Sequence, residues 1–316
     1  MTGAVLVTGA AGYIGAHVVA ELRRAGHRVV AVDDLSAGFP ERLPSDDLHE
    51  LDLASPTAPD AIAQLLRRHE VDVVVHLAAL KDVGESMTAP ERYYRVNVLG
   101  TLQVLEGMRD AGVRRIVFSS TAAVYGDVDS PAVDEAFPRE PINPYGRSKV
   151  VGEWMLEDAA RAWGLRWLAL RYFNVAGAAR PELRDRVAKN LVPLVVGRLS
   201  EGQDAVVYGD DHPTRDGTCV RDYLHVADLA EAHVAAVAAL RAEPLGLAVN
   251  LGTGSGSTVR EVVDAVAAEL GVAAEPHVVG RRDGDPAAMV ADASRAAQVL
   301  GWQARRQLRD IVRSST

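Results

Sequence analysis

Two residues four positions apart, Tyr145 and Lys149, have side chains that could do acid–base chemistry together. Lysine occurs at only three positions, 81, 149 and 189, among 34 basic residues, which singles out Lys149. Residues four apart share one face of a helix, so the ammonium can lie beside the phenol. At roughly 4 Å and an effective dielectric of about 20, that charge favours the phenolate by up to about 4 kcal/mol. We therefore expect a lowered pKa for Tyr145 and a role as catalytic base.

The Tyr-x-x-x-Lys pattern is short, and a chance ion-dipole pair on a helix surface would look the same. A lysine rather than an arginine favours the chemical interpretation, because a compact ammonium can also bind a ribose hydroxyl. The surrounding elements have to decide between the two.

The first half of the chain alternates short apolar runs with longer helical patterns. Such alternation predicts a doubly wound α/β fold (Rossmann) with a parallel sheet covered on both faces. The expected strands are Ala4–Thr8, Arg28–Asp33, Val71–His76, Arg114–Ser119 and Arg166–Tyr172. The expected helices lie near Ile14–Ala25, Pro59–His69, Tyr93–Ala111 and Ser148–Trp163.

After about residue 176 the alternation becomes irregular. We expect strands at Val206–Tyr208 and Ala248–Leu251, helices at Val226–Leu240 and Val259–Leu270, and a charged loop at Val279–Pro286. Ser257 or Thr258 is suited to cap the helix that follows it. The sequence thus predicts a domain of residues 1–175 and a smaller lobe of residues 176–316, with residues of about 222–253 crossing back to the first.

Composition restricts the class of protein. The 316 residues are 48% hydrophobic with a formal charge of −9, which argues against nucleic acid and anionic membranes as partners. No apolar run reaches the roughly 18–20 residues of a membrane span, and strand-like sequence by Ala4 leaves no room for a signal peptide. Cys219 is the only cysteine, which fits a reducing compartment. We expect a soluble cytoplasmic protein without a metal.

Three glycines, Gly9, Gly12 and Gly15, follow the first strand and open the first helix. In this context they permit a tight turn, close approach of a pyrophosphate and close packing of helix on strand, with the helix N-terminus facing the phosphates. The first gap is one residue longer than in G-x-G-x-x-G. The alternative is a glycine-rich turn that binds nothing.

Asp33 ends the second strand, eighteen residues beyond Gly15, where an acid can accept hydrogen bonds from ribose hydroxyls. A carboxylate there repels a 2′-phosphate and no arginine follows it, so the sequence favours NAD over NADP. Asp34 is suited to an ordinary loop position. Asp52 has two interpretations, a contact to the adenine amino group or a solvated loop acid.

With these motifs, the chain resembles the extended short-chain dehydrogenase/reductase family, and within it the sugar-nucleotide 4-epimerases. The resemblance covers nearly the whole chain in the expected order. It rests on residues 7–15, 76–81, 119–126, 143–149, 171–174 and 216–223.

The resemblance implies a third catalytic residue, Thr121, whose hydroxyl shares the proton that passes to Tyr145. A structural turn threonine is the alternative. Related dehydratases carry an Asp-Glu pair directly after this threonine, whereas Ala122 and Ala123 stand here, so dehydration lacks its acid and base.

The family pattern also assigns binding residues. The implied cofactor is NAD, held by Gly9, Gly12, Tyr13, Ile14, Gly15, Asp33, Asp52, Leu53, Leu77, Ala78, Ala79, Lys81, Asn97, Ser119, Tyr145, Lys149 and Tyr172. Asn97 is equally suited to be an interior polar residue, and Tyr172 and Phe173 to be core aromatics.

The implied substrate is a UDP-sugar, bound by Lys81, Thr121, Asn174, Asn190, Leu191, Tyr208, Arg221, Arg282, Asp285 and Met289. Single arginines are more often surface residues, and Arg281 is expected to be solvated. We interpret His225 as structural. Met289 stands at a position beside the sugar 2-substituent where the family varies its residue. Methionine is flexible, so the sequence leaves open whether UDP-N-acetylhexosamines are substrates.

The resemblance therefore implies NAD-dependent 4-epimerisation of a UDP-hexose, UDP-glucose or UDP-galactose, through a transient 4-keto sugar, by a homodimer. The alternatives are another UDP-sugar 4-epimerase, acting on an N-acetylhexosamine or a pentose, and a non-catalytic NAD-binding regulatory protein.

Overall fold

A computed structural model describes residues 3–43, 48–128, 130, 132–187, 189–282 and 286–316. Contacts divide the chain into two compact units. Unit 1 comprises Met1–Gly126, Arg139–Arg171 and Ala230–Val249, and unit 2 comprises Asp127–Pro138, Tyr172–Leu229 and Asn250–Thr316. These bounds differ from the expected 1–175 and 176–316. The assignment of cofactor and substrate binding to two domains stays a prediction.

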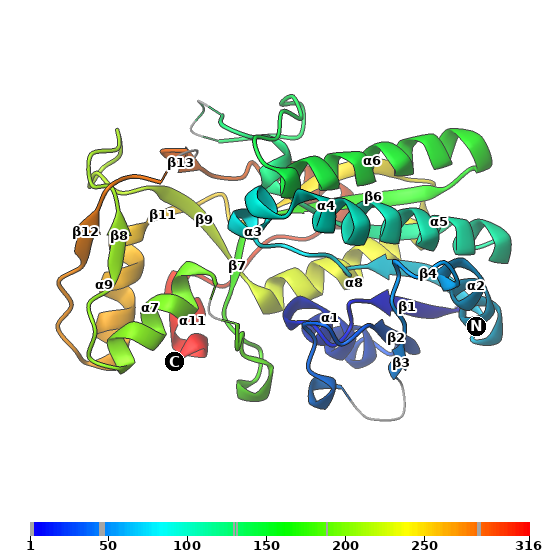
Figure 1. Cartoon of the computed structure of the whole chain (residues 1–316), viewed down its shortest axis with the longest axis horizontal. Coiled ribbons are helices and arrows are strands. Elements are labelled where there is room, and N and C mark those ends of the chain that lie inside the picture. Colours follow the sequence, from blue (N-terminus) through cyan, green and yellow to red (C-terminus); the bar gives the residue numbers. More distant parts are fainter. Residues whose placement is uncertain (1–2, 44–47, 129, 131, 188, 283–285) are drawn as a thin grey trace. The chain divides into compact units, whose positions relative to one another are not determined.

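Unit 1 is built on a seven-stranded sheet (Figure 1) with the order β10-β6-β5-β4-β1-β2-β3. The strands are β1 (Ala4–Thr8), β2 (Val29–Asp33), β3 (Leu48–Glu50), β4 (Val71–His76), β5 (Arg115–Thr121), β6 (Arg166–Tyr172) and β10 (Gly246–Leu251). The pairs β1–β2, β1–β4, β2–β3 and β4–β5 are parallel. The strand order reverses between β1 and β4, where doubly wound sheets bind ligands at the carboxyl ends of their strands. The expected fold class is confirmed.

The helices of unit 1 are α1 (Tyr13–Arg24), α2 (Ala58–Arg68), α3 (Val83–Thr88), α4 (Pro90–Tyr93), α5 (Gly100–Ala111) and α6 (Pro144–Trp163), with α8 (Val226–Ala242) shared with unit 2. The expected helix at Tyr93–Ala111 is interrupted by a π-helical segment, η3 (Tyr94–Leu99). Helix α6 begins before the expected Ser148, because the Asn143 side chain accepts a hydrogen bond from the Gly146 N–H at 2.8 Å and Pro144 occupies the first helical position.

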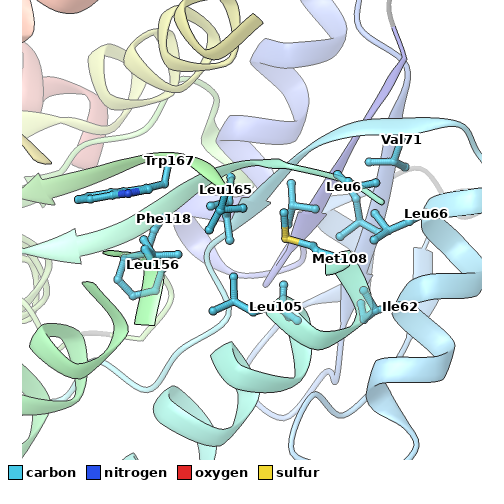
Figure 2. Packing of buried hydrophobic residues seen from close by; sticks show 14 of the residues in the cluster. Leu6, Ile62, Leu66, Val71, Leu105, Met108, Phe118, Leu156, Leu165 and Trp167 are labelled. Carbon is cyan, nitrogen blue, oxygen red and sulfur yellow. The ribbon is translucent and has the colours of Figure 1, made fainter. Parts of the chain in front are cut away.

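Apolar side chains from both the sheet and its helices form the core of unit 1 (Figure 2). Leu6 of β1, Ile62 and Leu66 of α2 and Met108 of α5 are almost fully buried together. Burying one such side chain contributes about 1.5–3 kcal/mol. The uniform apolar runs of the sequence thus become strands buried on both faces.

Unit 2 contains β9 (Val220–His225), which pairs with β7 (Asn174–Ala176), β11 (Gly256–Thr258) and β13 (Ala288–Met289). Strands β8 (Val206–Tyr208) and β12 (His277–Val279) form a separate parallel pair. The helices are α7 (Leu191–Ser200), α9 (Val259–Leu270), α10 (Ser294–Leu300) and α11 (Leu308–Ser315).

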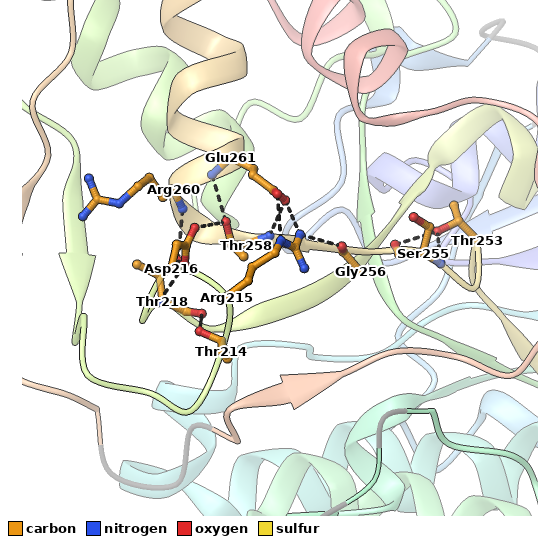
Figure 3. Close-up of polar contacts among 10 residues, drawn as sticks. All are labelled: Thr214, Arg215, Asp216, Thr218, Thr253, Ser255, Gly256, Thr258, Arg260 and Glu261. Atoms are coloured by element: carbon orange, nitrogen blue, oxygen red, sulfur yellow. Dashed lines mark hydrogen bonds and ion pairs between the residues drawn. The ribbon is translucent and has the colours of Figure 1, made fainter.

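A polar network fixes the start of α9 in unit 2 (Figure 3). Thr258 caps the helix, accepting from the Glu261 N–H at 3.0 Å, as one of the two expected caps. Asp216 accepts from the Thr258 hydroxyl at 2.5 Å and from the Thr218 N–H at 2.9 Å. Arg215 forms a bidentate ion pair with Glu261. The network ties the segment before β9 to α9.

The helices in the described part of the chain include none with the length and apolarity that a membrane crossing requires.

Candidate active site

The turn after β1 is too crowded to carry side chains. Gly9 has a φ of +67°, and a Cβ there would lie 2.7 Å from the Ala78 nitrogen. A Cβ on Gly15 would lie 1.9 Å from the Gly9 oxygen. Gly12 caps α1 without a side-chain hydrogen bond, and the first turn of α1 carries no acid. This is a backbone cradle at a helix N-terminus, the arrangement that binds phosphate groups.

The carboxylate of Asp33 closes the same region at the end of β2. It is buried and accepts from the Ala11 N–H at 2.9 Å and from the Leu35 N–H at 2.8 Å. Burial raises the pKa of Asp33, against which these two hydrogen bonds act. Asp33 therefore joins the glycine turn to the loop after β2, in the position expected of a ribose-binding acid.

A buried hydrogen-bond chain joins β1, β4 and α5. The Thr101 hydroxyl donates to the Asn97 carbonyl at 2.6 Å, so His76 Nε2 must donate to Thr101 Oγ1, 3.0 Å away. His76 Nδ1 then accepts from the Thr8 hydroxyl at 2.7 Å, and Thr8 Oγ1 accepts from the N–H groups of Leu77 and Ala78. Burial, assisted by the charge of Lys149, lowers the pKa of His76 to about 3, so the ring is neutral.

The side chain of Asn97 connects the loop after β4 to helix α6. Its Oδ1 accepts from the Leu80 N–H at 2.8 Å, and its Nδ2 donates to the Leu80 carbonyl at 3.0 Å and to Ser148 Oγ at 2.9 Å. Ser148 in turn donates to the Tyr145 carbonyl at 2.7 Å. Asn97 lies in the π-helical segment η3, a deviation often found at functional sites. Asn97 has the interior role that was one of its two interpretations, because it is buried and bonded to the backbone of Leu80, whereas a contact with the cofactor stays a prediction.

Thr121 and Tyr145 are two of the three expected catalytic residues. Hydrogen bonding with the Thr121 side chain acts to lower the pKa of Tyr145, and Thr121 Oγ1 accepts from the Ala123 N–H at 3.2 Å. The Tyr145 ring packs edge-on against Tyr93, with centroids 6.5 Å apart. The strand end and the helix start therefore hold the two hydroxyl groups together.

Lys149 is the third expected catalytic residue. Its ammonium is buried, donates to Ser119 Oγ at 3.4 Å and lies 5.0 Å from the centroid of the Phe118 ring. Burial lowers the pKa of Lys149 to about 7. Lys149 is therefore held in a dry environment where its charge is easily lost.

The expected lowering of the Tyr145 pKa is wrong for this structure. Burial raises the pKa of Tyr145, and the hydrogen bond with Thr121 only partly offsets the rise. The physical reason is that burial disfavours the charged forms of both Tyr145 and Lys149, an effect that charge and distance alone do not include. Helical spacing places both residues on one face of α6, but it contains no measure of how strongly burial disfavours their charged forms.

Other expected cofactor residues also lie in unit 1. The Lys81 ammonium lies 5.6 Å from the centroid of the Tyr13 ring. Leu77 donates its N–H to the Thr8 carbonyl, which fixes the loop after β4. Asp52 is exposed and accepts from the Ala54 N–H at 2.8 Å, whereas Leu53 is buried. Their contacts to a cofactor stay predictions, as do those of Ile14 and Ala79.

Unit 2 contains most of the expected substrate residues. The Arg282 guanidinium stacks on the Tyr208 ring, 3.6 Å from its centroid. Both side chains are exposed. Stacking leaves the edge donors of an arginine available for phosphate oxygens. Arg281 is exposed and paired with Asp211 at 2.5 Å, which confirms its expected solvated role.

Arg221 and Met289 are register partners on the parallel strands β9 and β13. Arg221 Nη1 donates to the carbonyls of Val220 and Pro286 at 2.9 and 2.8 Å. Met289 is buried. The neighbouring Asp222 accepts from the N–H groups of Thr253, Gly254 and Ala291, which fixes these segments around β9.

The remaining expected residues are more dispersed in unit 2. Asn174 is exposed at the start of β7, and Asn190 donates to Asp185 Oδ2 at 3.3 Å just before Leu191 opens α7. Tyr172 is buried. Asp285 lies outside the described residues. None of these assignments to a ligand is tested by the fold.

His225 has the expected structural role, because both ring nitrogens are engaged in unit 2. Its Nδ1 accepts from the Ala227 N–H at 3.0 Å, so its Nε2 donates to Ser314 Oγ at 3.0 Å.

Sequence reasoning missed a buried ion pair beside the expected catalytic residues. Glu153 of α6 and Arg171 of β6 are joined by two hydrogen bonds of 2.9 and 2.7 Å. Ser120 donates to Glu153 at 2.6 Å, and Arg171 donates to the Tyr125 hydroxyl at 2.9 Å. The available signal was the position of Glu153, four residues after Lys149 on the same helix face.

The fold and the site together define an NAD-binding enzyme of the doubly wound class. The chain belongs to the NAD dependent epimerase/dehydratase family, whose model matches residues 5–252. The family resemblance inferred from the motifs is confirmed.

Curated relatives and solved structures extend this result. The chain is 44% identical over 317 residues to the UDP-glucose 4-epimerase of Azospirillum brasilense, covering 98% of this chain and 90% of that protein. The corresponding enzyme of Streptomyces lividans is 45% identical over 312 residues, covering 97% of this chain and 93% of that one. The structure of UDP-glucose-4-epimerase from Stenotrophomonas maltophila with bound NAD and formylated UDP-arabinopyranose has a TM-score of 0.94 at 41% identity, covering 99% and 96% of the two chains.

The residues of unit 1 fit NAD. The backbone cradle of Gly9, Gly12 and Gly15 excludes side chains where a pyrophosphate has to approach, and Asp33 stands at the ribose end without a neighbouring arginine. The expectation of NAD as the cofactor is confirmed by the family and by neighbouring structures with bound NAD.

Proposed function

We propose that this enzyme interconverts UDP-glucose and UDP-galactose by NAD-dependent epimerisation at C4 through a transient 4-keto sugar. The observation that carries the proposal is that Thr121 and Tyr145, which influence each other by hydrogen bonding, and Lys149, which donates to Ser119, lie in the unit that contains the glycine cradle. The identity to UDP-glucose 4-epimerases over nearly the whole chain supports it.

When bound, NAD supplies a two-electron acceptor that takes hydrogen from the sugar C4 and later returns it. Tyr145 removes the proton of the 4-hydroxyl, which Thr121 relays or shares through the hydrogen bond that joins the two side chains. We assign to Lys149 the charge that stabilises the phenolate; because burial lowers the pKa of Lys149 to about 7, this charge is fully present only below that pH. The same residues return the proton when the other face of the sugar is reduced.

Dehydration is excluded as the main reaction by the residues after Thr121. Ala122 and Ala123 carry no acid or base, so no group at these positions can protonate a leaving hydroxyl. The net reaction consumes no electrons, and the enzyme is expected to retain its cofactor through turnover.

In unit 2 we assign UDP binding to Arg221, Arg282 and Tyr208, with Asn174, Asn190 and Leu191 as further contacts. Arginines supply planar forks for pyrophosphate oxygens, and Tyr208 supplies an aromatic face. A structure from Bifidobacterium longum with NAD+ and UDP, 37% identical with a TM-score of 0.90 and covering 99% and 96% of the two chains, supports the nucleotide class.

The decisive experiment incubates the purified enzyme with UDP-galactose without added NAD and follows UDP-glucose formation. Conversion is expected, and Tyr145→Phe is expected to abolish it while leaving UDP binding intact. Parallel assays with UDP-N-acetylgalactosamine and UDP-arabinopyranose test the alternative sugars. Retained activity of Tyr145→Phe would refute the assignment of Tyr145 as the base. No conversion of any of these sugars, even with NAD supplied, would favour another sugar nucleotide or the regulatory alternative.

We also propose a homodimer in the cytoplasm. Helices α5 and α6 lie side by side in unit 1 (Figure 1) and carry the exposed apolar side chains Leu102 and Trp154. The sole cysteine fits a reducing compartment. Light scattering on the native enzyme and on Leu102→Glu tests the dimer, since a charge on this face should favour the monomer.

A further inference from the structure

Helix α6 carries an acid on the same face as its catalytic lysine. Glu153 follows Lys149 by four residues, so their Cβ atoms lie about 5–6 Å apart. A carboxylate at this spacing ordinarily pairs with a lysine ammonium. Within the described part of the chain, no carboxylate is bonded to Lys149, which instead donates to Ser119 Oγ at 3.4 Å. Another contact must therefore keep the Glu153 carboxylate from the Lys149 ammonium.

Arg171 of β6 holds this carboxylate. Its Nε and Nη2 donate to the two carboxylate oxygens of Glu153 at 2.9 and 2.7 Å. Its Nη1 donates to the hydroxyl of Tyr125 at 2.9 Å, and its guanidinium lies 5.0 Å from the centroid of that ring. Glu153 is 0% and Arg171 4% exposed, so water screens neither charge.

Two further contacts complete the arrangement around Glu153. Ser120 donates its hydroxyl to Oε1 at 2.6 Å, and Arg139 donates to Oε2 at 3.2 Å while also pairing with Glu157. Burial alone would raise the pKa of Glu153, but the bonds from Arg171 and Ser120 outweigh it and hold that pKa below its ordinary value. Glu153 is therefore a fully occupied carboxylate.

We propose that Arg171 and Glu153 are positioning residues: Arg171 sequesters the carboxylate of Glu153, so that the Lys149 ammonium stays directed at Ser119 instead of pairing along its own helix. The bonded Ser120 lies between Ser119 and Thr121 in the chain, so the same pair also ties the end of β5 to α6. The relevance of this device to catalysis rests on the proposed function, whereas the arrangement of charges does not.

The other titratable groups that face this region are compatible with such a device. His76 of β4 is neutral and hydrogen-bonded at both nitrogens, Tyr145 of α6 is a neutral phenol whose pKa is raised by burial, and Tyr125 bonds to Arg171. Arg139 is divided between two acids. The pairing of Glu153 with Arg171 is therefore the contact that keeps a free carboxylate off the helix face that carries Lys149.

The test measures the ionisation of Lys149 directly. The sequence contains three lysines, so protein labelled with ¹³C at lysine Cε gives three side-chain signals, which Lys149→Met assigns. The purified enzyme with its bound NAD is titrated by NMR in four forms: native, Arg171→Met, Glu153→Gln and the double variant.

We expect the two single substitutions to shift the Lys149 midpoint in opposite directions. Arg171→Met frees the carboxylate and should raise the midpoint by about one pH unit or more, as an opposite charge at close range does. Glu153→Gln leaves Arg171 unbalanced and should lower it, and the double variant should return near the native midpoint. If Arg171 and Glu153 served only packing, either substitution would let water reach Lys149 and raise its midpoint. A raised midpoint in both single variants would therefore overturn the proposal.

The proposal would also be overturned if the Lys149 midpoint stayed unchanged in both single variants. If Arg171→Met does not fold, Glu153→Gln still decides by its sign, because glutamine keeps the shape and can accept from Ser120 and Arg171. The NMR titration needs no turnover, so its result is separate from the outcome of the epimerase assay.

Discussion

The Lys149 ammonium lies over the Phe118 ring, with 5.0 Å between Nζ and the ring centroid. Gly152, three residues further along α6, permits this arrangement, because a Cβ there would lie 2.4 Å from Phe118 Cζ. The helix thus approaches the strand closely enough for an aromatic face to lie against the lysine. Such cation–π contacts contribute about 2 kcal/mol when water is excluded.

Gly152→Ala should therefore destabilise the enzyme by about 1–3 kcal/mol and reduce turnover, because Phe118 has to move. Urea unfolding measures the change. Gly197→Ala in α7 is the matched control, since a Cβ at Gly197 meets nothing within 4 Å. That control should be neutral or stabilise by up to about 1 kcal/mol. Equal effects of the two substitutions would show that crowding at Phe118 is absent.

Lys149 should make stability depend on pH in an unusual direction. Its pKa is about 7 in the folded state and about 10.4 in the unfolded chain, so between these values only the unfolded chain keeps the proton. Its contribution to stability therefore rises with pH in this window, by about 1.4 kcal/mol per unit.

The measurement compares the unfolding free energy of the native enzyme with that of Lys149→Met from pH 6 to 9. The unfolding free energy of the native enzyme, relative to that of Lys149→Met, should rise with pH above pH 7 and stay constant below it. Lys81→Met, at an exposed lysine, serves as the control and should run parallel to the native enzyme. A constant difference between native and Lys149→Met would contradict the assignment.

Thr121 should matter for its hydroxyl. Thr121→Val removes the hydrogen bond to Tyr145 and should lower kcat by roughly 10- to 100-fold, the rate equivalent of about 1–3 kcal/mol. The fluorescence-monitored affinity for UDP should stay the same. Thr121→Ser keeps the hydroxyl and should recover most of the rate, and an equal loss in both variants would point to packing instead.

Met289 should control the size of the accepted sugar. The side chain is buried on β13, so Met289→Tyr adds volume, and Met289→Ala removes it. We expect the tyrosine variant to lose UDP-N-acetylgalactosamine conversion relative to UDP-galactose and the alanine variant to gain it. The ratio of the two kcat/KM values reports this directly. Similar ratios in all three proteins would place the determinant elsewhere.

The sequence predicted the elements that depend on local pattern. Strands β1, β4 and β6 have the expected bounds, because strands buried on both faces are continuous apolar runs. The cradle at Gly9 and Gly15 was also readable, since only glycine fits where backbone approaches backbone.

The pairing of strands that lie far apart in the chain could not be predicted from the sequence. Strands β9 and β13 pair across a large sequence separation, and β13 has two residues, too few for a periodic signal. The π-helical segment η3 was not predicted, because its sequence has the same pattern as an ordinary α-helix. The Tyr145 pKa was mistaken, and Glu153 was missed, for one reason: both depend on burial and on partners that only the folded chain supplies.

The hydrogen-bond chain through Thr8, His76 and Thr101 has a consequence for kinetic data. Every hydroxyl and ring N–H in this chain donates in the same direction, and the last one donates to the Asn97 carbonyl. The hydrogen-bond chain therefore has a structural role and does not relay a proton. With a pKa of about 3, His76 also stays uncharged throughout the working range. An inflection near pH 7 in a rate profile therefore does not report on His76.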